Sequence, residues 1–122
     1  NIGIAYGTVI ENAIGTIFHD TIIGNDADNI LDGGEDGNDI ISGGSGDDTL
    51  LGRSGNDELH GEGDNDLLDG GDGVDQMFGG GGNDTIVYDA EDDLAFVNGG
   101  EGFDTLLFEL VWTSVDLIQY GF

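Results

Sequence analysis

A nine-residue unit recurs along most of this chain and restricts the folds open to it. The unit is Gly-Gly-x-Gly-x-Asp-x-apolar-x. Clear copies begin at Gly43 (GGSGDDTLL), Gly70 (GGDGVDQMF), Gly79 (GGGGNDTIV) and Gly99 (GGEGFDTLL). Copies at Gly52 and Gly61 keep the period but have lost glycines. A short, fixed period predicts a solenoid of stacked coils.

Nine residues divide into a six-residue turn and a three-residue strand. Glycines at the first, second and fourth places supply positive φ angles, which other residues adopt only at a cost. Two repeats make one coil, so alternate turns stack on the same edge and alternate strands lie side by side. We therefore expect an all-β fold, a right-handed parallel β-roll (β-solenoid).

The apolar eighth place of the repeat should form a thin internal stack. Its members are Ile22, Leu31, Ile41, Leu50, Leu59, Leu68, Met77, Ile86 and Leu106. The repeat at 88–96 lacks glycine, so Ala95 should thin the stack there, with Val97 and Asn98 as a two-residue insertion. An extra residue is expected near Gly33, with the register regular from Gly34.

The sixth place of the repeat should form two acidic ladders, one on each edge. One ladder contains Asp20, Asp39, Asp57, Asp75 and Asp93, and the other Asn29, Asp48, Asp66, Asp84 and Asp104. Carboxylates about 5 Å apart repel by ~3 kcal/mol per neighbouring pair at an effective dielectric constant near 20. With 27 acidic residues, one basic residue and a net charge of −26, the chain needs a cation to neutralise the ladders.

Calcium fits these turns best among the common metal ions. It takes six to eight oxygen ligands in variable geometry, whereas magnesium needs a strict octahedron and retains its waters. Zinc and copper prefer nitrogen or sulfur. The chain has no cysteine, and its two histidines, His19 and His60, are expected to be surface residues.

These repeats resemble the calcium-binding β-roll of the repeats-in-toxin (RTX) family of secreted bacterial proteins. The resemblance covers about 15–107. The lead-in IAYGTVIENAIG at 4–15, with GNDADNILDGG at 24–34, further resembles the C-terminal domain of serralysin-type secreted metalloproteases.

The RTX resemblance implies that each ion lies between two turns on the same edge. Carbonyls at the first and third places of one turn, and at the second and fourth of the next, would join both aspartates, giving roughly five or six ions. The implied ligands are Gly34, Glu35, Asp36, Gly37, Asp39, Gly43, Gly44, Ser45, Gly46, Asp48, Gly52, Arg53, Ser54, Gly55, Asp57, Gly61, Glu62, Gly63, Asp64, Asp66, Gly70, Gly71, Asp72, Gly73, Asp75, Gly79, Gly80, Gly81, Gly82, Asp84, Gly99, Gly100, Glu101, Gly102 and Asp104. Asp20, Asn29 and Asp93 belong to incomplete turns and are left open as ligands.

The resemblance also implies a function in secretion and folding. Such modules pass unfolded through a type I secretion channel and fold in external calcium, so the expected partners are calcium, the secretion machinery and an adjoining domain. The alternatives are a structural or adhesive solenoid segment, or an accessory domain of a secreted protease or other enzyme. The sequence has no His-Glu-x-x-His motif and no Ser-His-Asp or Cys-His set, so we expect no catalysis in this segment.

Charge and composition limit the remaining possibilities. A net charge of −26 makes nucleic acid and acidic membrane surfaces poor partners, and no apolar run is long enough to span a membrane. We expect lead-in strands and a degenerate repeat over 1–23, the calcium-binding β-roll over 24–107, and a capping segment with Trp112 over 108–122. The segment is expected to belong to a longer protein.

Overall fold

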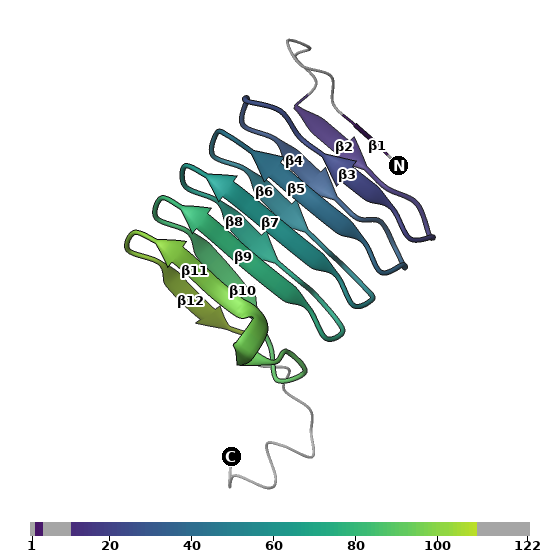
Figure 1. Ribbon diagram of the computed structural model, residues 1–122. Helices are drawn as coiled ribbons and strands as arrows, with labels where there is room; N and C mark the ends of the chain where they lie inside the picture. The colour runs from purple at the N-terminus through teal and green to yellow at the C-terminus, as the bar shows by residue number, and fades with distance from the viewer. Residues whose placement is uncertain (1, 4–10, 110–122) are drawn as a thin grey trace, which may run out of the picture.

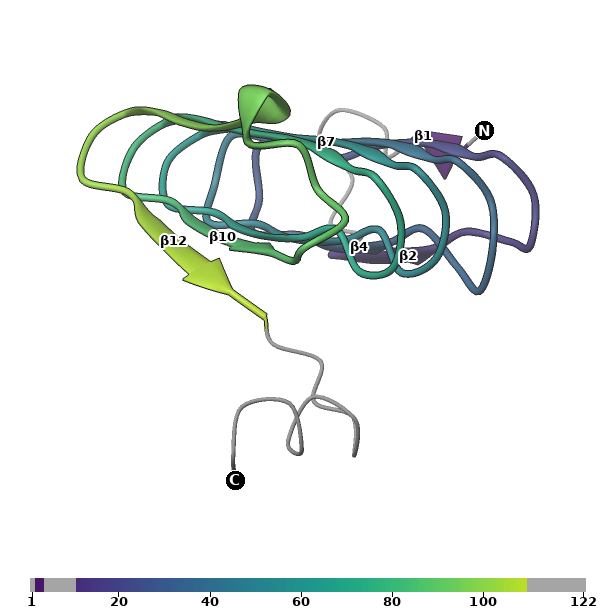
Figure 2. The ribbon, with the colours of Figure 1, turned by 90° about the horizontal axis from the view of Figure 1, so that it is seen from below.

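The chain forms a flattened coil of two parallel β-sheets. The computed structural model describes residues 2–3 and 11–109. In Figure 1 the strands succeed one another along the axis, with turns on both edges and the first and last strands at opposite ends of the stack. Figure 2, seen from below, shows two layers of strands joined by the turns. The predicted all-β parallel solenoid is confirmed.

Each sheet contains every second strand of the chain. One sheet has the order β1-β3-β5-β7-β9-β11, with strands at Ile2–Gly3, Thr21–Ile23, Ile40–Gly44, Glu58–Gly63, Gln76–Gly81 and Val97–Glu101. The other has the order β12-β10-β8-β6-β4-β2, with strands at Thr105–Phe108, Thr85–Tyr88, Leu67–Asp69, Thr49–Leu51, Ile30–Asp32 and Asn12–Ile14. A 3₁₀ helix, η1, spans Leu94–Phe96. Within the described residues, no helix has the length and apolar character needed to cross a membrane.

The register follows the nine-residue period. Leu59 of β7 lies opposite Ile41 of β5 and Met77 of β9, and in the other sheet Leu68 lies opposite Leu50 and Ile86. In parallel pairing a slip of one residue would turn every apolar side chain outward. The eighth-place residues therefore fix the register by sharing one dry interior.

The core is a single column of side chains between the sheets. Its members, Ile22, Leu31, Ile41, Leu50, Leu59, Leu68, Met77 and Ile86, have no exposed surface, and Val97 is 9% exposed. The first eight were predicted from the repeat. Leu106, also predicted to be a member, is 49% exposed because it is in the last strand described, β12, and no described coil covers it.

The turns depend on left-handed backbone angles at the second and fourth places. Gly44 and Gly46 have φ values of 110° and 104°. Three non-glycine residues adopt the same region: Arg53 at 79°, Glu62 at 80° and Asp64 at 74°. Side chains are strained there, so the shape of the turn is imposed by the stacking of neighbouring coils even where glycine has been lost.

The predicted register is wrong in the glycine-free repeat at 88–96. Val97, not Ala95, lies opposite Met77 and continues the core. The ladder place belongs to Asp92, whose Oδ1 accepts the Asp75 N–H at 2.8 Å, and not to Asp93, which caps η1 by accepting the Ala95 N–H. The reason is conformational, since no residue of this turn has a positive φ. The chain therefore forms a shorter turn and then inserts η1.

The register is also shifted at the turn before Asp39. Gly34 has the positive φ of a second-place residue, at 114°, and Gly37 that of the fourth place, at 129°. The first place therefore belongs to Gly33, and the extra residue lies within the turn, at Glu35 or Asp36, not before Gly34. The predicted capping segment at 108–122 lies largely outside the described residues.

Two leucines at equivalent places test how the column is stabilised. Leu59→Ala should lower the free energy of unfolding by about 2–5 kcal/mol, the cost of a cavity in a core that cannot collapse. Leu106→Ala should lower it by less than half as much, because Leu106 is half exposed. Urea unfolding in saturating calcium measures both. Equal losses would show that Leu106 is as well covered as Leu59.

Candidate metal centre

The sixth-place aspartates lie buried where each turn enters its strand. Asp39, Asp48, Asp57, Asp66, Asp75 and Asp84 are each 3% exposed or less. The sequence predicted all six for the two edges. Side chains of this kind are rarely buried without a partner, so their surroundings determine what the turns can do.

One oxygen of each carboxylate joins consecutive coils. The backbone N–H of Asp39 donates to Oδ1 of Asp57 at 2.8 Å, and on the other edge the N–H of Asp48 donates to Oδ1 of Asp66 at 2.8 Å. The same bond recurs along both ladders, ending at Asp92 on one edge and Asp104 on the other. Each aspartate is thereby held with its Oδ1 toward the preceding coil.

The second oxygen of these carboxylates has no partner. Buried Oδ2 atoms without a hydrogen bond belong to Asp39, Asp48, Asp57, Asp66, Asp75 and Asp84. An unsatisfied buried charge costs several kcal/mol. Six such atoms at equivalent positions indicate a ligand site beside each of them.

Backbone carbonyls converge on the same positions from two coils. A methyl group built on Gly52 would meet both Oδ2 of Asp57 and the carbonyl oxygen of Gly70, which points back toward the preceding coil. Methyl groups on Gly71 and Gly73 would meet the carbonyls of Arg53 and Gly55, which point forward. The interval between two turns thus receives second- and fourth-place carbonyls from the earlier turn and a first-place carbonyl from the later one. This is the reverse of the order expected from the resemblance.

The donor set of each interval fits a hard cation. It consists of carboxylate and carbonyl oxygens, with no nitrogen or sulfur, as calcium prefers. Across the described part of the chain, no three side chains of His, Cys, Asp or Glu gather closely enough to hold a metal by themselves. A cation between two turns would therefore need backbone carbonyls as well as carboxylates.

Burial raises the pKa values of the ladder aspartates. Asp66 and Asp75 reach about 7, mainly by desolvation, with repulsion from neighbouring carboxylates adding to it. Asp48 and Asp57 reach about 6 for the same reason. The pKa values of Asp39 and Asp84 are raised as well. Without a cation, the ionised ladder is therefore an unfavourable state of the folded chain.

The first two turns differ, because their own donors satisfy the ladder residue. Oδ2 of Asp20 accepts the N–H and the hydroxyl of Thr16 at 2.6 and 2.8 Å. The backbone N–H bond, with the hydroxyl bond second, lowers the pKa of Asp20. Asn29 accepts the Asn25 N–H and donates to its side chain. These turns lack the unpaired oxygen that distinguishes the six later ones.

The residues at the fifth place of the repeat also form a ladder of side chains on each edge, which was not predicted. Oδ1 of Asn38 accepts the N–H of Asn56 at 2.9 Å, and Oδ1 of Asn56 accepts that of Val74 at 2.9 Å. On the other edge the series runs through Asp28, Asp47, Asn65, Asn83 and Phe103. These side chains point toward the following coil, opposite to the sixth-place aspartates. The signal in the sequence was the recurrence of Asn or Asp before the ladder aspartate.

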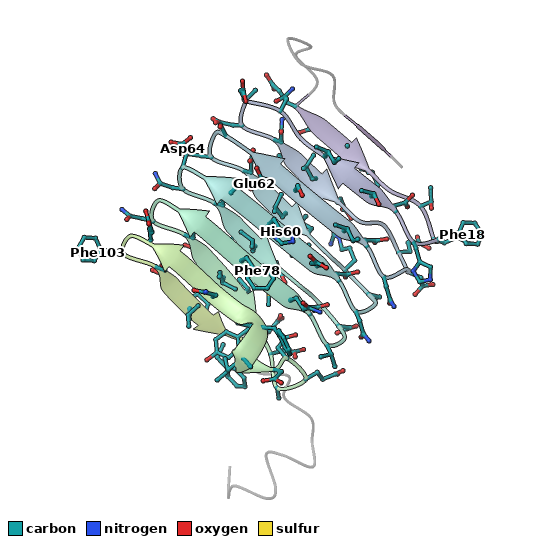
Figure 3. All side chains as sticks on the ribbon, viewed as in Figure 1. Phe18, His60, Glu62, Asp64, Phe78 and Phe103 are labelled. Atoms are coloured by element: carbon teal, nitrogen blue, oxygen red, sulfur yellow. The ribbon has the colours of Figure 1, made fainter. Side chains whose placement is uncertain are left out.

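His19 is the first acceptor of the fifth-place ladder. His19 is exposed, as expected from the sequence, and its Nδ1 accepts the Asn38 N–H at 2.7 Å. His60 lies on the face of the first sheet, where its ring stacks on Phe78 with centroids 5.2 Å apart (Figure 3). Neither histidine lies among the converging carbonyls.

The residues that stand in place of turn glycines make side-chain contacts of their own. Arg53 donates from Nε and a terminal nitrogen to Oδ2 of Asp32, at 3.0 and 2.6 Å, which lowers the pKa of Asp32. Oδ2 of Asp64 accepts the Gly46 N–H at 3.0 Å. Phe18 and Phe103 protrude from opposite edges of the roll (Figure 3). The backbone carbonyl of Arg53 accepts the Asp72 N–H at 2.7 Å.

The predicted ligand residues are brought together, with two corrections. Each predicted turn from Asp39 to Asp84 lies against the next turn on its own edge. The turn ending at Asp104 lies against the Asp84 turn that precedes it. Gly33 was missed as the first-place residue of the Asp39 turn, although the Gly33-Gly34 pair is itself the signature of the first two places. Asp92 was missed because the nine-residue count passed over it to Asp93.

Comparison with known protein families identifies the family of the chain. The family model of the RTX calcium-binding nonapeptide repeat (4 copies) matches residues 9–36, 34–68 and 51–86. The matched residues cover more than half of the chain, which therefore belongs to this family of calcium-binding repeats. None of the curated proteins matches the chain.

The raised pKa values predict that acid stabilises the calcium-free roll. A carboxyl whose pKa is higher in the folded state than in the unfolded state binds protons more tightly when folded. Its contribution is full below about pH 3.8 and is lost as the pH rises through about 6–7. The β signal of the calcium-free chain in circular dichroism should therefore be larger at pH 5.5 than at pH 8.

Ordinary surface carboxylates stay ionised over this pH range, so the change reports the buried ladder. A chain with His19→Asn and His60→Asn removes the contribution of the histidines. An equal or larger β signal at pH 8 would contradict the burial of ionisable carboxylates in the roll.

Proposed function

We propose that this chain is an extracellular calcium-binding module whose folding is driven by calcium and which supports the secretion and stability of a larger protein. The observation that carries the proposal is the set of six buried Oδ2 atoms without hydrogen-bond partners. An RTX repeat already implies calcium. The unpaired oxygens add a reason why the fold needs it.

The proposed ligands lie in five intervals between complete turns. On one edge they join the Asp39 and Asp57 turns and the Asp57 and Asp75 turns. On the other they join Asp48 to Asp66, Asp66 to Asp84 and Asp84 to Asp104. In each interval one unpaired Oδ2, the next aspartate and carbonyls of both turns would bind one ion.

Secretion follows from the charge of the ladders. At low cytosolic calcium the carboxylates repel and the chain would stay unfolded, the form that a type I secretion channel transports. At high external calcium, binding to the folded state alone stabilises it by mass action. We therefore place the module outside the cell, joined to a neighbouring domain, with the roll at 24–107 and the segment 108–122 as its cap.

An adhesive solenoid is the second candidate. An outward Thr ladder would favour it, and Thr49, Thr85 and Thr105 do share one face. The ladder is broken by Leu67, which lies between Thr49 and Thr85. A depression of about 800 Å³ in the described part is lined by Ile14, Ile17, Asp32 and Arg53 among others. Asp32 and Arg53 are already paired with each other.

A calcium titration followed by circular dichroism tests the proposal. The chain in excess chelator at pH 8 should give a coil spectrum and convert to β on addition of calcium. The transition should fall near ~10⁻⁴–10⁻³ M, the range of extracellular modules, and should be cooperative because adjacent intervals share a turn. Magnesium at the same concentrations should not replace calcium. A chain that is fully folded in chelator would overturn the proposal.

Two substitutions on one edge separate the effect of the unpaired oxygen from the effect of net charge. Asp66→Asn keeps an Oδ1 acceptor for the Asp48 N–H but replaces Oδ2 with an amide that repels a cation. It should weaken two intervals, raise the calcium midpoint at least several-fold and lower the number of ions counted by calorimetry. Asp47→Asn removes the same charge at the fifth place, where Asn65 and Asn83 occur naturally, and should change the midpoint little. Equal effects would mean that only net charge matters.

A further inference from the structure

The glycine-free turn at 88–92 continues the first acidic ladder. Asp92 accepts the backbone N–H of Asp75 through Oδ1 at 2.8 Å, the same bond that joins Asp57 to Asp75. Its Oδ2 accepts the N–H of Asp89 at 3.0 Å, which holds the carboxylate in place. The turn lies beyond the residues that the RTX family model matches, which end at 86. The family match thus assigns nothing to it.

Asp75 presents an unpaired oxygen to this turn. The residue has no exposed surface, and its Oδ2 has no hydrogen bond. In the preceding turn of the same edge, which ends at Asp57, a methyl group on Gly52 would contact both Oδ2 of Asp57 and the carbonyl oxygen of Gly70 from the following coil. Oδ2 of Asp75 lies in the same relation to Gly70. It therefore faces the interval between the Asp75 turn and the Asp92 turn.

The earlier half of this interval is complete. Gly71 and Gly73 have φ values of 85° and 131°, matching the 79° and 133° of Arg53 and Gly55, whose carbonyls point forward. The later half is incomplete, because β10 runs one residue further and the Tyr88 carbonyl accepts the Glu109 N–H at 2.8 Å. A first-place carbonyl is therefore missing, and the Asp92 carboxylate is the protein ligand that this half retains.

We propose that a further calcium ion binds between the Gly70–Asp75 turn and the glycine-free turn at 88–92, held by Oδ2 of Asp75, the carboxylate of Asp92 and the carbonyls of Gly71 and Gly73. Water completes the coordination, as it commonly does for calcium. With fewer protein ligands than the five intervals between complete turns, this site is the weakest and fills last. It ends the first ladder with an ion in place of an unpaired charge.

This inference rests on the proposed function, and a pair of adjacent substitutions separates the two. Asp92→Asn and Asp93→Asn each remove one negative charge. Only Asp92 faces Asp75, whereas Asp93 accepts the Ala95 N–H at the start of η1, which Asn can also do. Calorimetric counting of bound calcium should give one ion fewer for Asp92→Asn than for the parent chain, and the parent number for Asp93→Asn. Circular dichroism at saturating calcium checks that both fold.

The outcomes distinguish the two claims. If Asp92→Asn binds as many ions as Asp93→Asn, with the same weakest affinity, the further site does not exist while the five others stand. If the parent chain binds no calcium, the proposed function fails together with this inference.

A second measurement leaves every acidic residue in place. Terbium(III) is a hard, oxygen-binding ion that emits when an excited tyrosine lies close by. Tyr88 precedes the turn, and its ring packs on Phe108 with centroids 5.3 Å apart. Tyr88→Phe keeps that contact and should abolish the part of the tyrosine-excited terbium emission that grows in with the last ion bound. Emission unchanged at every terbium concentration would overturn the site.

Discussion

The unpaired oxygen of each buried ladder aspartate is the constraint on which the rest of this structure depends. Asp57 and Asp66 show it most clearly, because each lies mid-ladder with one oxygen bonded to the preceding coil and the other without any partner. Burying a charged oxygen unpaired is unfavourable, and stacking like charges along an edge adds repulsion. A thin core one side chain wide has little to set against this. In the proposed function, bound calcium offsets these costs.

Two side-chain ladders of opposite direction maintain the spacing of the coils. Sixth-place aspartates reach back to the preceding coil, while fifth-place residues such as Asn38 and Asn65 accept N–H groups from the following one. Each turn is thus held from both sides, and its carbonyls are aimed into the intervals above and below. This explains why Arg53, Glu62 and Asp64 can adopt left-handed angles normally left to glycine. The fifth-place ladders end at Val74 and Phe103, whose apolar side chains cannot accept an N–H from the following coil.

Much of this arrangement follows from the sequence, because period and chemistry coincide. The spacing of Asp39, Asp48, Asp57 and their successors fixed both the edge on which each lies and the apolar column. The failures occur where the count of nine no longer describes the backbone. At Gly33 an extra residue is absorbed inside the turn, and at Asp92 a turn without glycine is shortened and compensated by η1. Counting residues cannot locate an insertion, since that depends on which backbone angles are accessible. The fifth-place ladder was missed because its members vary among His, Asn and Asp.

The most direct test of the central claim is a crystal structure of the calcium-loaded chain with anomalous scattering to locate the ions. We expect an ion about 2.3–2.6 Å from Oδ2 of mid-ladder Asp57 and Asp66, with carbonyls of the earlier and later turns completing each sphere. A folded roll in which those oxygens contact only water or protein donors, with calcium bound elsewhere, would contradict the account.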